Sequence, residues 1–348
     1  MNKTNKSLFL VLTDGKPGHE TQSDGVVRLL KPHSLDNETV YLKIKKVPKG
    51  LNIALRFLLN YFQLSSFLEK YLTLPDLKSV DMVYVISAGG DTLVPNVLLT
   101  RYFIQNKIKV KNIILSSLRG VQSTNFNAVF TINSELENQP NFFYYPISPN
   151  KMVFKANEFQ SLDSENMKIL VLIGADTKDV KIGTAKNWFK LVENLKKQYP
   201  CSQIMLTTSR RTRIEFEKEL FELLMSSPLT MHDHYHMYNM GNQVTISDLI
   251  LSSSFVIISQ DSGSMVSEAI MGEKKTLLVG DSNQLNNTTM QNYFKALTNS
   301  GLLAYVDFNE TNFESKLEHL TVKNHSFALS NKLQEMLKVT RITDKKSP

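Results

Sequence analysis

Residues that can do acid–base chemistry are grouped in one short stretch near the start of the chain. Asp14, His19 and Glu20 lie within seven residues, directly after the apolar run at residues 8–13. Each can accept a proton from a hydroxyl group, and the unperturbed pKa of histidine lies nearest to neutral pH. We expect His19 or Glu20, ahead of Asp14, to act as a general base, with Gly18 in contact with substrate. The alternative is an ordinary turn between a strand and a helix.

A second turn combines two glycines with a carboxylate. Gly89, Gly90 and Asp91 follow the apolar run at residues 82–87. Glycine lets a ligand approach the backbone closely, but the spacing is neither the G-x-G-x-x-G of dinucleotide-binding turns nor a Walker lysine motif. We expect these three residues to contact the acceptor or the donor. A turn without a ligand is the alternative.

Hydroxyl groups and two arginines are combined at residues 208–212. Arginine binds phosphate through paired hydrogen bonds, and the first turn of a helix adds partial positive charge. An amphipathic stretch at residues 214–225 follows, so this group lies where a strand passes into a helix. We expect a phosphate site, against the alternative of an exposed helix cap. Its members are Thr208, Ser209, Arg210, Arg211 and Thr212.

A fourth polar group follows the apolar run at residues 255–259. Ser262 or Ser264 can cap a helix there, and Glu268 then falls one turn inside it. A carboxylate at that place can accept hydrogen bonds from both hydroxyls of a ribose. A helix cap without a ligand is the alternative, but the residue three after Ser264 is a serine, so the capping box is imperfect. We expect Asp261, Ser262, Ser264 and Glu268 to bind a nucleotide.

Short apolar runs and longer amphipathic stretches alternate along the whole chain. This pattern is typical of βαβ units, whose parallel sheets are covered on both faces. The alternation stops in the polar, proline-containing residues 134–166 and then restarts. We predict an α/β protein with two doubly wound, Rossmann-like domains that face one another across a cleft, residues 1–150 and 151–348. The predicted strands are residues 8–13, 39–44, 82–87, 112–116, 128–131, 168–173, 203–207, 255–259, 275–279 and 302–306.

The overall composition is that of a globular chain and limits its partners. Of 348 residues, 42% are hydrophobic and 21% charged, which excludes a mainly disordered protein. The net charge of +7 favours anionic partners, but the lysines are scattered and no nucleic-acid motif occurs. The single cysteine, Cys201, excludes an intrachain disulfide and indicates an intracellular protein. No run of about 20 apolar residues could span a bilayer.

Three of the four polar groups described above, in this order along the chain, resemble motifs of the "elongated mitochondria" family of mitochondrial fission proteins, which has bacterial members. The likeness is carried by residues 14–23, 208–212 and 261–269 and spans residues 8–280. That family is similar to nucleotide-sugar glycosyltransferases of the GT-B type. The resemblance implies a cytoplasmic, inverting, metal-independent transferase without a cofactor, of the kind used in lipopolysaccharide or capsule synthesis. The second domain would hold the nucleotide-sugar donor and the first a glycan or lipid-linked acceptor. The sugar, the base and the acceptor stay open.

The sequence departs from the family pattern in two places. The family usually has Gly-Arg-Arg-Thr where residues 89–92 read Gly-Gly-Asp-Thr, so two positive charges are lost. The family's Asp-Pro-Arg after the next strand is replaced by Ser-Leu-Arg at residues 117–119. These two departures imply that the acceptor or the donor differs from that of the family.

Two other features have a functional and a structural interpretation. His232, His234 and His236 would share one face of a strand and could bind zinc, but we favour a loop whose histidines touch the donor. A lysine-rich stretch at residues 43–49 precedes the apolar, aromatic residues 51–72. The latter could lie in a membrane interface, although a pair of core helices is favoured. A non-catalytic scaffold at an anionic membrane surface, peripheral to the inner membrane, is the alternative to a transferase.

Overall fold

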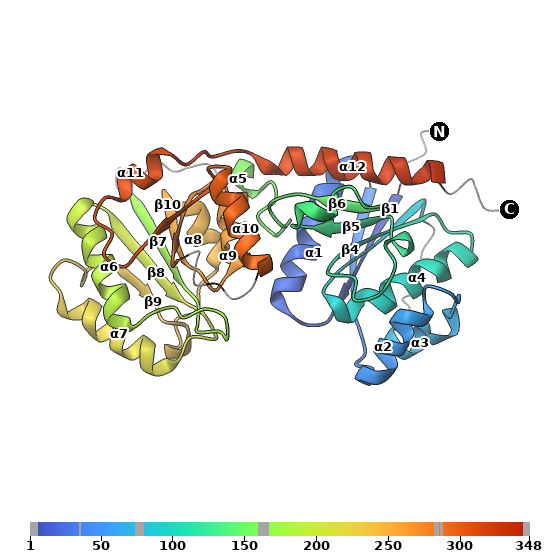
Figure 1. The fold of residues 1–348 in the computed structure, drawn as a ribbon, viewed down its shortest axis with the longest axis horizontal. Helices are drawn as coiled ribbons and strands as arrows, with labels where there is room; N and C mark the ends of the chain where they lie inside the picture. The colour runs from blue at the N-terminus through green and yellow to red at the C-terminus, as the bar shows by residue number, and fades with distance from the viewer. Residues whose placement is uncertain are drawn as a thin grey trace. The chain divides into compact units, whose positions relative to one another are not determined.

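The computed structural model describes residues 6–34, 36–73, 80–158, 167–281, 285 and 288–343. Contacts divide the chain into two compact units, Met1–Val153 with His325–Pro348, and Phe154–Asn324. Each unit is built on one six-stranded sheet with helices packed on it (Figure 1). None of the helices in the described ranges is long and apolar enough to cross a membrane.

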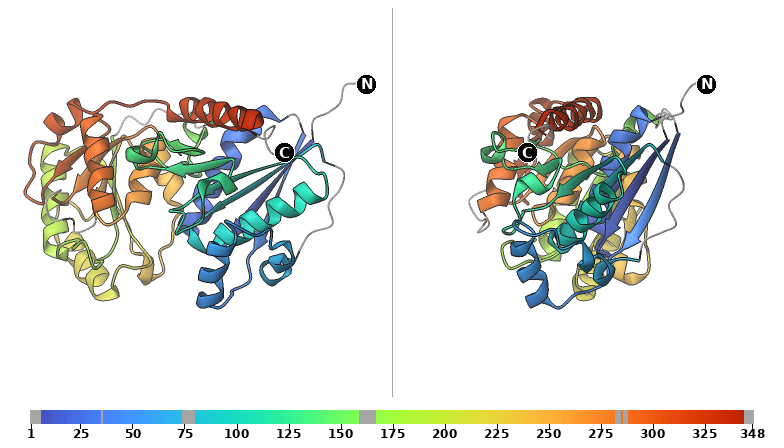
Figure 2. Two further views of the ribbon diagram at one scale, coloured as in Figure 1. Left: turned by 45° about the vertical axis from the view of Figure 1, so that its right-hand side comes forward. Right: turned by 90° about the vertical axis from the view of Figure 1, so that its right-hand side faces the viewer.

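The first unit has a parallel sheet with the strand order β2-β1-β3-β4-β5-β6. Its central strands are buried on both faces: Phe9, Leu10 and Val11 in β1 and Val85 and Ile86 in β3 have no exposed surface. Helices pack against this sheet in both views of Figure 2. The strands are β1 (Lys6–Thr13), β2 (Asp36–Lys43), β3 (Met82–Ala88), β4 (Val110–Leu115), β5 (Ala128–Thr131) and β6 (Phe142–Tyr144). The helices are α1 (Pro17–Leu30), α2 (Lys49–Leu58), α3 (Leu68–Tyr71), α4 (Leu93–Gln105) and α12 (His325–Thr343), with 3-10 turns η1 (Lys31–His33), η2 (Ser65–Phe67), η3 (Gly90–Thr92), η4 (Ser123–Asn125) and η5 (Ser134–Leu136).

The second unit repeats the design with the strand order β12-β11-β10-β7-β8-β9, again parallel. Its core contains the fully buried Trp188, whose indole N–H donates to the carbonyl of Ile182. The strands are β7 (Lys168–Ile173), β8 (Gln203–Thr208), β9 (His234–His236), β10 (Phe255–Ser259), β11 (Lys275–Val279) and β12 (Leu303–Val306). The helices are α5 (Lys155–Glu158), α6 (Ala185–Gln198), α7 (Ile214–Ser226), α8 (Ile246–Ser252), α9 (Gly263–Met271), α10 (Thr288–Asn299) and α11 (Phe313–Glu318), with the 3-10 turn η6 (Tyr238–Met240).

The last helix, α12, belongs to the first unit although it follows the second one in the chain. Ser330 donates its hydroxyl proton to the carbonyl of Leu29 at the end of α1, and His33 Nε2 lies 3.0 Å from the same hydroxyl. Leu329 and Leu333 are buried against this unit. The expected second domain, residues 151–348, therefore loses its last helix to the first unit, because the apolar face of α12 is buried there.

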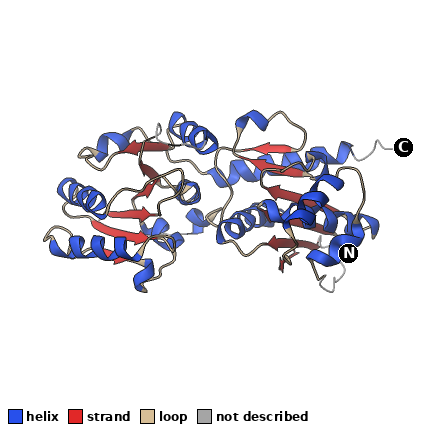
Figure 3. Cartoon of the chain, turned by 60° about the horizontal axis from the view of Figure 1, so that its bottom comes forward, coloured by secondary structure: helices blue, strands red, loops and turns tan. Residues whose placement is uncertain are grey.

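Each sheet has one point at which the order of strand addition reverses. In the first sheet it lies between β1 and β3, and in the second between β7 and β10. At such a point the loops at the carboxyl ends of the two strands run to opposite sides, which leaves space for ligands. Figure 3 shows the strands of both sheets within their helical layers. The predicted site loops after β1, β3 and β10 all begin at these two points.

Candidate functional site

The reversal point of the first sheet brings together the two predicted loops of that unit. Asp14 leaves the end of β1 and accepts a hydrogen bond from the backbone N–H of Lys16, which closes the turn before α1. Its carboxylate also pairs with His19 Nδ1 at 2.9 Å and with Lys16 Nζ at 2.9 Å. The sequence thus folds residues 14–19 into a compact polar turn in which the carboxylate orients the imidazole.

The charge state of Asp14 is fixed by its neighbours. Its side chain is only 5% exposed, and burial alone would raise its pKa. The hydrogen bonds and charges of Lys16 and His19 outweigh this effect, so the pKa of the Asp14 carboxyl lies below its ordinary value. An ionised Asp14 favours the tautomer in which His19 carries its proton on Nδ1. Nε2, which bonds to none of the described residues, then has a lone pair available to accept a proton.

Gly89 makes room for the imidazole of His19. Its φ of +88° suits glycine, and a Cβ at this position would lie 2.2 Å from Cε1 of the His19 ring. The loop after β3 therefore holds the histidine against its backbone. Asp91 follows two residues later and pairs with Lys16 Nζ at 3.2 Å, joining the two loops by an ion pair.

The other predicted residues of this unit lie at the same edge with different partners. Glu20 accepts a hydrogen bond from the hydroxyl of Thr13, and so its carboxylate is held back against the strand end. Gly18 is exposed in the first turn of α1, with no atom within 4 Å of a Cβ placed on it. Helix α1 begins at Pro17, so His19 and Glu20 are helical residues rather than loop residues.

The reversal point of the second sheet is centred on Asp261. The side chain of this residue has no exposed surface, and its oxygens accept hydrogen bonds from Ser259 Oγ, the N–H of Ala175 and Arg211 Nη2, the last at 2.8 Å. A Cβ on Gly174 would lie 2.1 Å from Asp261 Oδ1. Asp261 therefore ties the loops after β7, β8 and β10 together.

The hydroxyls of the predicted phosphate loop are used within the protein. Thr208 donates to Glu217, Thr212 donates to the carbonyl of Gly174, and Ser209 accepts from the N–H of Arg211. All three hydroxyl residues are buried, whereas Arg210 and Arg211 are exposed. The arginines, and above all Arg211 beside Asp261, are the groups of this loop that can reach a ligand.

Helix α9 begins directly after Asp261. Ser262 caps it by accepting a hydrogen bond from the N–H of Met265, and Ser264 is exposed at its first turn. Glu268 lies four residues after Ser264, on the same face of the helix, and is 8% exposed. The arrangement combines a helix N-terminus, a hydroxyl and a largely buried carboxylate.

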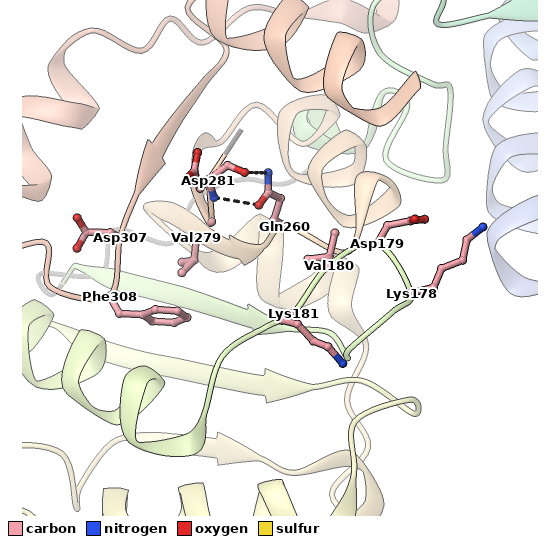
Figure 4. Close-up of a pocket in the computed structure, with 10 residues that line it drawn as sticks. Lys178, Asp179, Val180, Lys181, Gln260, Val279, Asp281, Asp307 and Phe308 are labelled. Carbon is pink, nitrogen blue, oxygen red and sulfur yellow. Dashed lines mark hydrogen bonds between the residues drawn. The ribbon is translucent and has the colours of Figure 1, made fainter. Parts of the chain in front are cut away.

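A cavity of about 470 Å³ opens at the carboxyl ends of β7, β10, β11 and β12, and its lining includes Gln260, which precedes α9 in the chain. Gln260 donates its amide N–H to the carbonyl of Asp281 and accepts from the N–H of the same residue (Figure 4). Phe308 lines the cavity and packs edge-on against Trp188. The volume lies in the range of small-molecule sites. Its lining residues are Lys178, Asp179, Val180, Lys181, Gln260, Val279, Gly280, Asp281, Asp307 and Phe308.

The three alternating histidines do not converge. Strand β9 contains His234 and His236 on one face with the buried Tyr235 between them, and His232 precedes the strand. Burial, with a smaller effect of His234, lowers the pKa of His236 below its ordinary value. Within the described ranges, no three His, Cys, Asp or Glu side chains are arranged to hold a metal ion.

Comparison with known proteins assigns the chain to a family. The family Mitochondrial fission ELM1 matches residues 17–326. This chain belongs to that family. The resemblance seen in the three polar groups is thereby confirmed over most of the sequence. Among curated proteins, none matches the sequence.

Solved structures of other proteins share the fold of this ELM1-family chain. UDP-GlcNAc 2-epimerase from Methanocaldococcus jannaschii is similar with a TM-score of 0.57 at 12% identity, over 98% of this chain and 100% of that chain. A putative UDP-N-acetylglucosamine 2-epimerase from Listeria monocytogenes has a TM-score of 0.57 at 10% identity, over 100% of this chain and 99% of that chain. UDP-GlcNAc 2-epimerase from Neisseria meningitidis, bound to UDP-GlcNAc, has a TM-score of 0.54 at 14% identity, over 96% of this chain and 100% of that chain. The predicted α/β class with two Rossmann-like domains of the GT-B type is confirmed.

Some groups at these edges were not among the sites expected from the sequence of this ELM1-family chain. Arg56 Nη2 donates to the carbonyl of Gly90 at 3.0 Å, and the guanidinium of Arg119 lies against the same glycine. Lys16 joins Asp14 to Asp91. Arg56 is 34 residues from Gly90 and stands alone among apolar residues, so no spacing signal marks it. The cavity residues Gly280, Asp281 and Phe308 also lack a motif.

Proposed function

We propose that the chain is a nucleotide-sugar glycosyltransferase whose second unit binds the donor. The observation that carries the proposal is the group at the reversal point of the second sheet: the N-terminus of α9, Ser264, the largely buried Glu268 and the adjoining cavity. Glu268 accepts hydrogen bonds from the ribose hydroxyls, and the cavity beside Gln260 and Phe308 takes the base. UDP-N-acetylglucosamine is the first donor to test, because proteins of this fold are named for it.

The diphosphate lies at the first turn of α9 in this proposal. Its charge is met by the partial positive charge of the helix N-terminus and by Arg211, whose side chain is 49% exposed beside Asp261. Asp261 holds Arg211 in place through its Nη2 atom. These groups also stabilise the negative charge that develops on the diphosphate as it leaves.

The first unit supplies the base. His19 Nε2 takes the proton of an acceptor hydroxyl, and the oxygen forms a bond to the anomeric carbon of the sugar. The bond from that carbon to the diphosphate breaks, with its electron pair passing to the diphosphate. Asp14 stabilises the imidazolium that forms, because its carboxylate lies 2.9 Å from Nδ1. A single displacement of this kind inverts the anomeric centre.

The test is a product analysis with UDP-N-acetylglucosamine and a cell-membrane extract as the acceptor source. The proposal expects UDP release that depends on the acceptor and transfer of labelled sugar to the extract. Conversion of the donor to its 2-epimer without any acceptor would instead assign an epimerase. Failure to act on UDP, GDP, ADP or CMP sugars, together with a lack of nucleotide binding, would leave the non-catalytic scaffold.

A further inference from the structure

The guanidinium groups of Arg56 and Arg119 both contact Gly90, at the carboxyl edge of the first sheet. Arg56 reaches Gly90 from α2, with Nη2 3.0 Å from the carbonyl oxygen. Arg119 reaches it from the loop after β4, and a Cβ on Gly90 would lie 2.4 Å from its Cζ atom. Because a Cβ on residue 90 would overlap the guanidinium of Arg119, the glycine allows Arg119 to lie beside the backbone carbonyl that Arg56 binds.

The positive charge at this point exceeds the neighbouring negative charge. Asp91 lies 3.7 Å from Arg56 and 3.2 Å from Lys16, and Lys16 also pairs with Asp14. Lys16 and Arg56 therefore share two carboxylates, of which Asp14 also holds His19, and Arg119 adds a third positive charge beside Gly90. Burial and the charge of Arg119 lower the pKa of the Arg56 guanidinium, with Asp91 acting in the opposite direction. A bound anion would relieve this repulsion.

Arg56 has a donor that the described residues leave unused. Its side chain is 11% exposed, and its Nε atom is buried without a hydrogen-bond partner among the described residues. A buried N–H without a partner costs free energy, and such groups in native structures call for an explanation. The exposed 11% of the Arg56 side chain is the part that an anionic group can contact.

The helix that carries Arg56 exposes an apolar stripe. Ile53 and Phe57 on α2 and Tyr61 in the turn that follows α2 are 64%, 63% and 65% exposed, and the rings of Phe57 and Tyr61 lie 5.7 Å apart. The opposite face of the helix packs Leu55 and Leu59 into the core. We call residues 53, 57 and 61 the α2 stripe. Figures 1 and 2 show α2 and α3 projecting beyond the strands of the first unit.

The approach to the α2 stripe is basic. Lys43, Lys45, Lys46 and Lys49 are exposed in the residues that lead into α2. Exposed aromatic and aliphatic side chains beside lysines are the pattern of a helix that lies in the interface of an anionic bilayer. The charge of this segment is therefore complementary to one occupant, a lipid surface with anionic headgroups.

We propose that α2 is the recognition element for a membrane lipid with a phosphate headgroup, whose phosphate binds Arg56 and Arg119 and whose hydrocarbon contacts the α2 stripe. The proposal rests on the proposed function, since it identifies the acceptor as an amphiphile held near His19. Gly90 is the next residue after Gly89, which packs on His19, so the headgroup would lie beside the base.

The experiment is co-sedimentation of the full chain with vesicles of phosphatidylcholine, with or without phosphatidic acid. The parent protein binds the vesicles that contain phosphatidic acid, and binding falls as salt rises. Arg119→Gln lowers this partitioning about fivefold, the effect of one basic residue near a charged surface. The triple variant Ile53→Ser/Phe57→Ser/Tyr61→Ser lowers it about tenfold or more, because three apolar side chains lose their insertion.

Two control variants match these changes elsewhere in the same unit. Ile104→Ser removes an apolar side chain that is 60% exposed on α4, and Lys109→Gln removes a charge at the amino end of β4. Both control variants are expected to bind the phosphatidic acid vesicles as strongly as the parent protein does. Thermal unfolding and nucleotide titration are run on every variant, so a failure of the donor site is recognised separately from a failure of lipid binding.

Three results would overturn the proposal. The first is an absence of vesicle binding by the parent. The second is equal loss in Ile104→Ser and in the triple variant. The third is a parent that forms a dimer in solution which the triple variant disrupts, because the α2 stripe would then be covered by a second copy. Stabilisation by inorganic phosphate that requires Arg119, without vesicle binding, would assign the arginine pair to a free phosphate instead.

Discussion

Among single residues, the pair of Asp14 and His19 carries the proposed reaction. The removal of a general base typically lowers the rate about 10²–10⁴-fold. His19→Ala is expected to reduce sugar transfer by this order while nucleotide affinity stays at the parental value, because the nucleotide is assigned to the other unit. His319→Ala, which changes an exposed histidine of the second unit, is the matched control and keeps full turnover. A parental rate in His19→Ala would remove the histidine from the reaction.

The same pair makes a prediction about stability and pH. The folded pKa of Asp14 lies below its ordinary value, so the ionised carboxylate stabilises the folded state above the unfolded pKa, and this contribution is lost as pH falls through the folded pKa. Asp14→Asn should lower the free energy of unfolding by about 1.5–3 kcal/mol at neutral pH, the cost of hydrogen bonds to a charged group. The difference from the parent should begin to shrink below about pH 4, where the carboxyl of the unfolded chain is protonated, and continue to shrink until the pH passes the lower pKa of the folded carboxyl. Urea titrations over this pH range measure it, and a difference that does not change with pH would contradict the assignment.

At the scale of elements, the turns that follow the strands determine where the site groups lie. Gly89→Ala places a Cβ 2.2 Å from the His19 ring in a backbone with φ +88°, so it should displace the histidine and lower turnover. Gly120→Ala imposes the same kind of backbone strain at φ +92°, but nothing lies within 4 Å of its Cβ. Both variants should lose about 1–3 kcal/mol of stability, and only Gly89→Ala should lose transfer activity. Equal rates in the two folded variants would show that the packing of His19 on Gly89 is not needed.

Elements with strong local patterns were predictable, and those set by distant contacts were not. Strands β5, β7, β10 and β11 have the predicted bounds, because each is a buried apolar run. The three-residue edge strands β6 and β9 lack such a run and were missed. The candidate loops follow strand ends, but the strand order that puts the loops after β1, β3 and β10 at the reversal points was not predicted from the sequence. The pairing of Lys16 with Asp91, 75 residues apart, depends on strand order and has no signature in the local sequence.

At the scale of the whole molecule, the chain crosses from one unit to the other twice. Helix α12 completes the first unit, with Leu333 buried to 1% exposure and Lys332 paired with Glu137. Leu333→Ala should lower the free energy of unfolding by about 2–5 kcal/mol, the cost of a cavity in a core. Phe327→Ala, on a side chain that is 59% exposed, should change it far less. Denaturant titration compares the two, and equal effects would mean that α12 does not need its buried face to hold it on the first unit.

Binding of a nucleotide by the second unit at the start of α9 can be measured by isothermal titration with UDP and UDP-N-acetylglucosamine. We expect saturable binding by the parent and by His19→Ala. Arg211→Ala should weaken binding by about 1.5–3 kcal/mol, since a charge-assisted hydrogen bond to the diphosphate is lost, and Arg210→Ala, a neighbour not bonded to Asp261, should weaken it less. Glu268→Gln should also weaken binding, with the ribose hydroxyls losing a charged acceptor. A parent that binds no UDP, GDP, ADP or CMP ligand, or equal affinities in the parent, Arg211→Ala and Glu268→Gln, would contradict the claim.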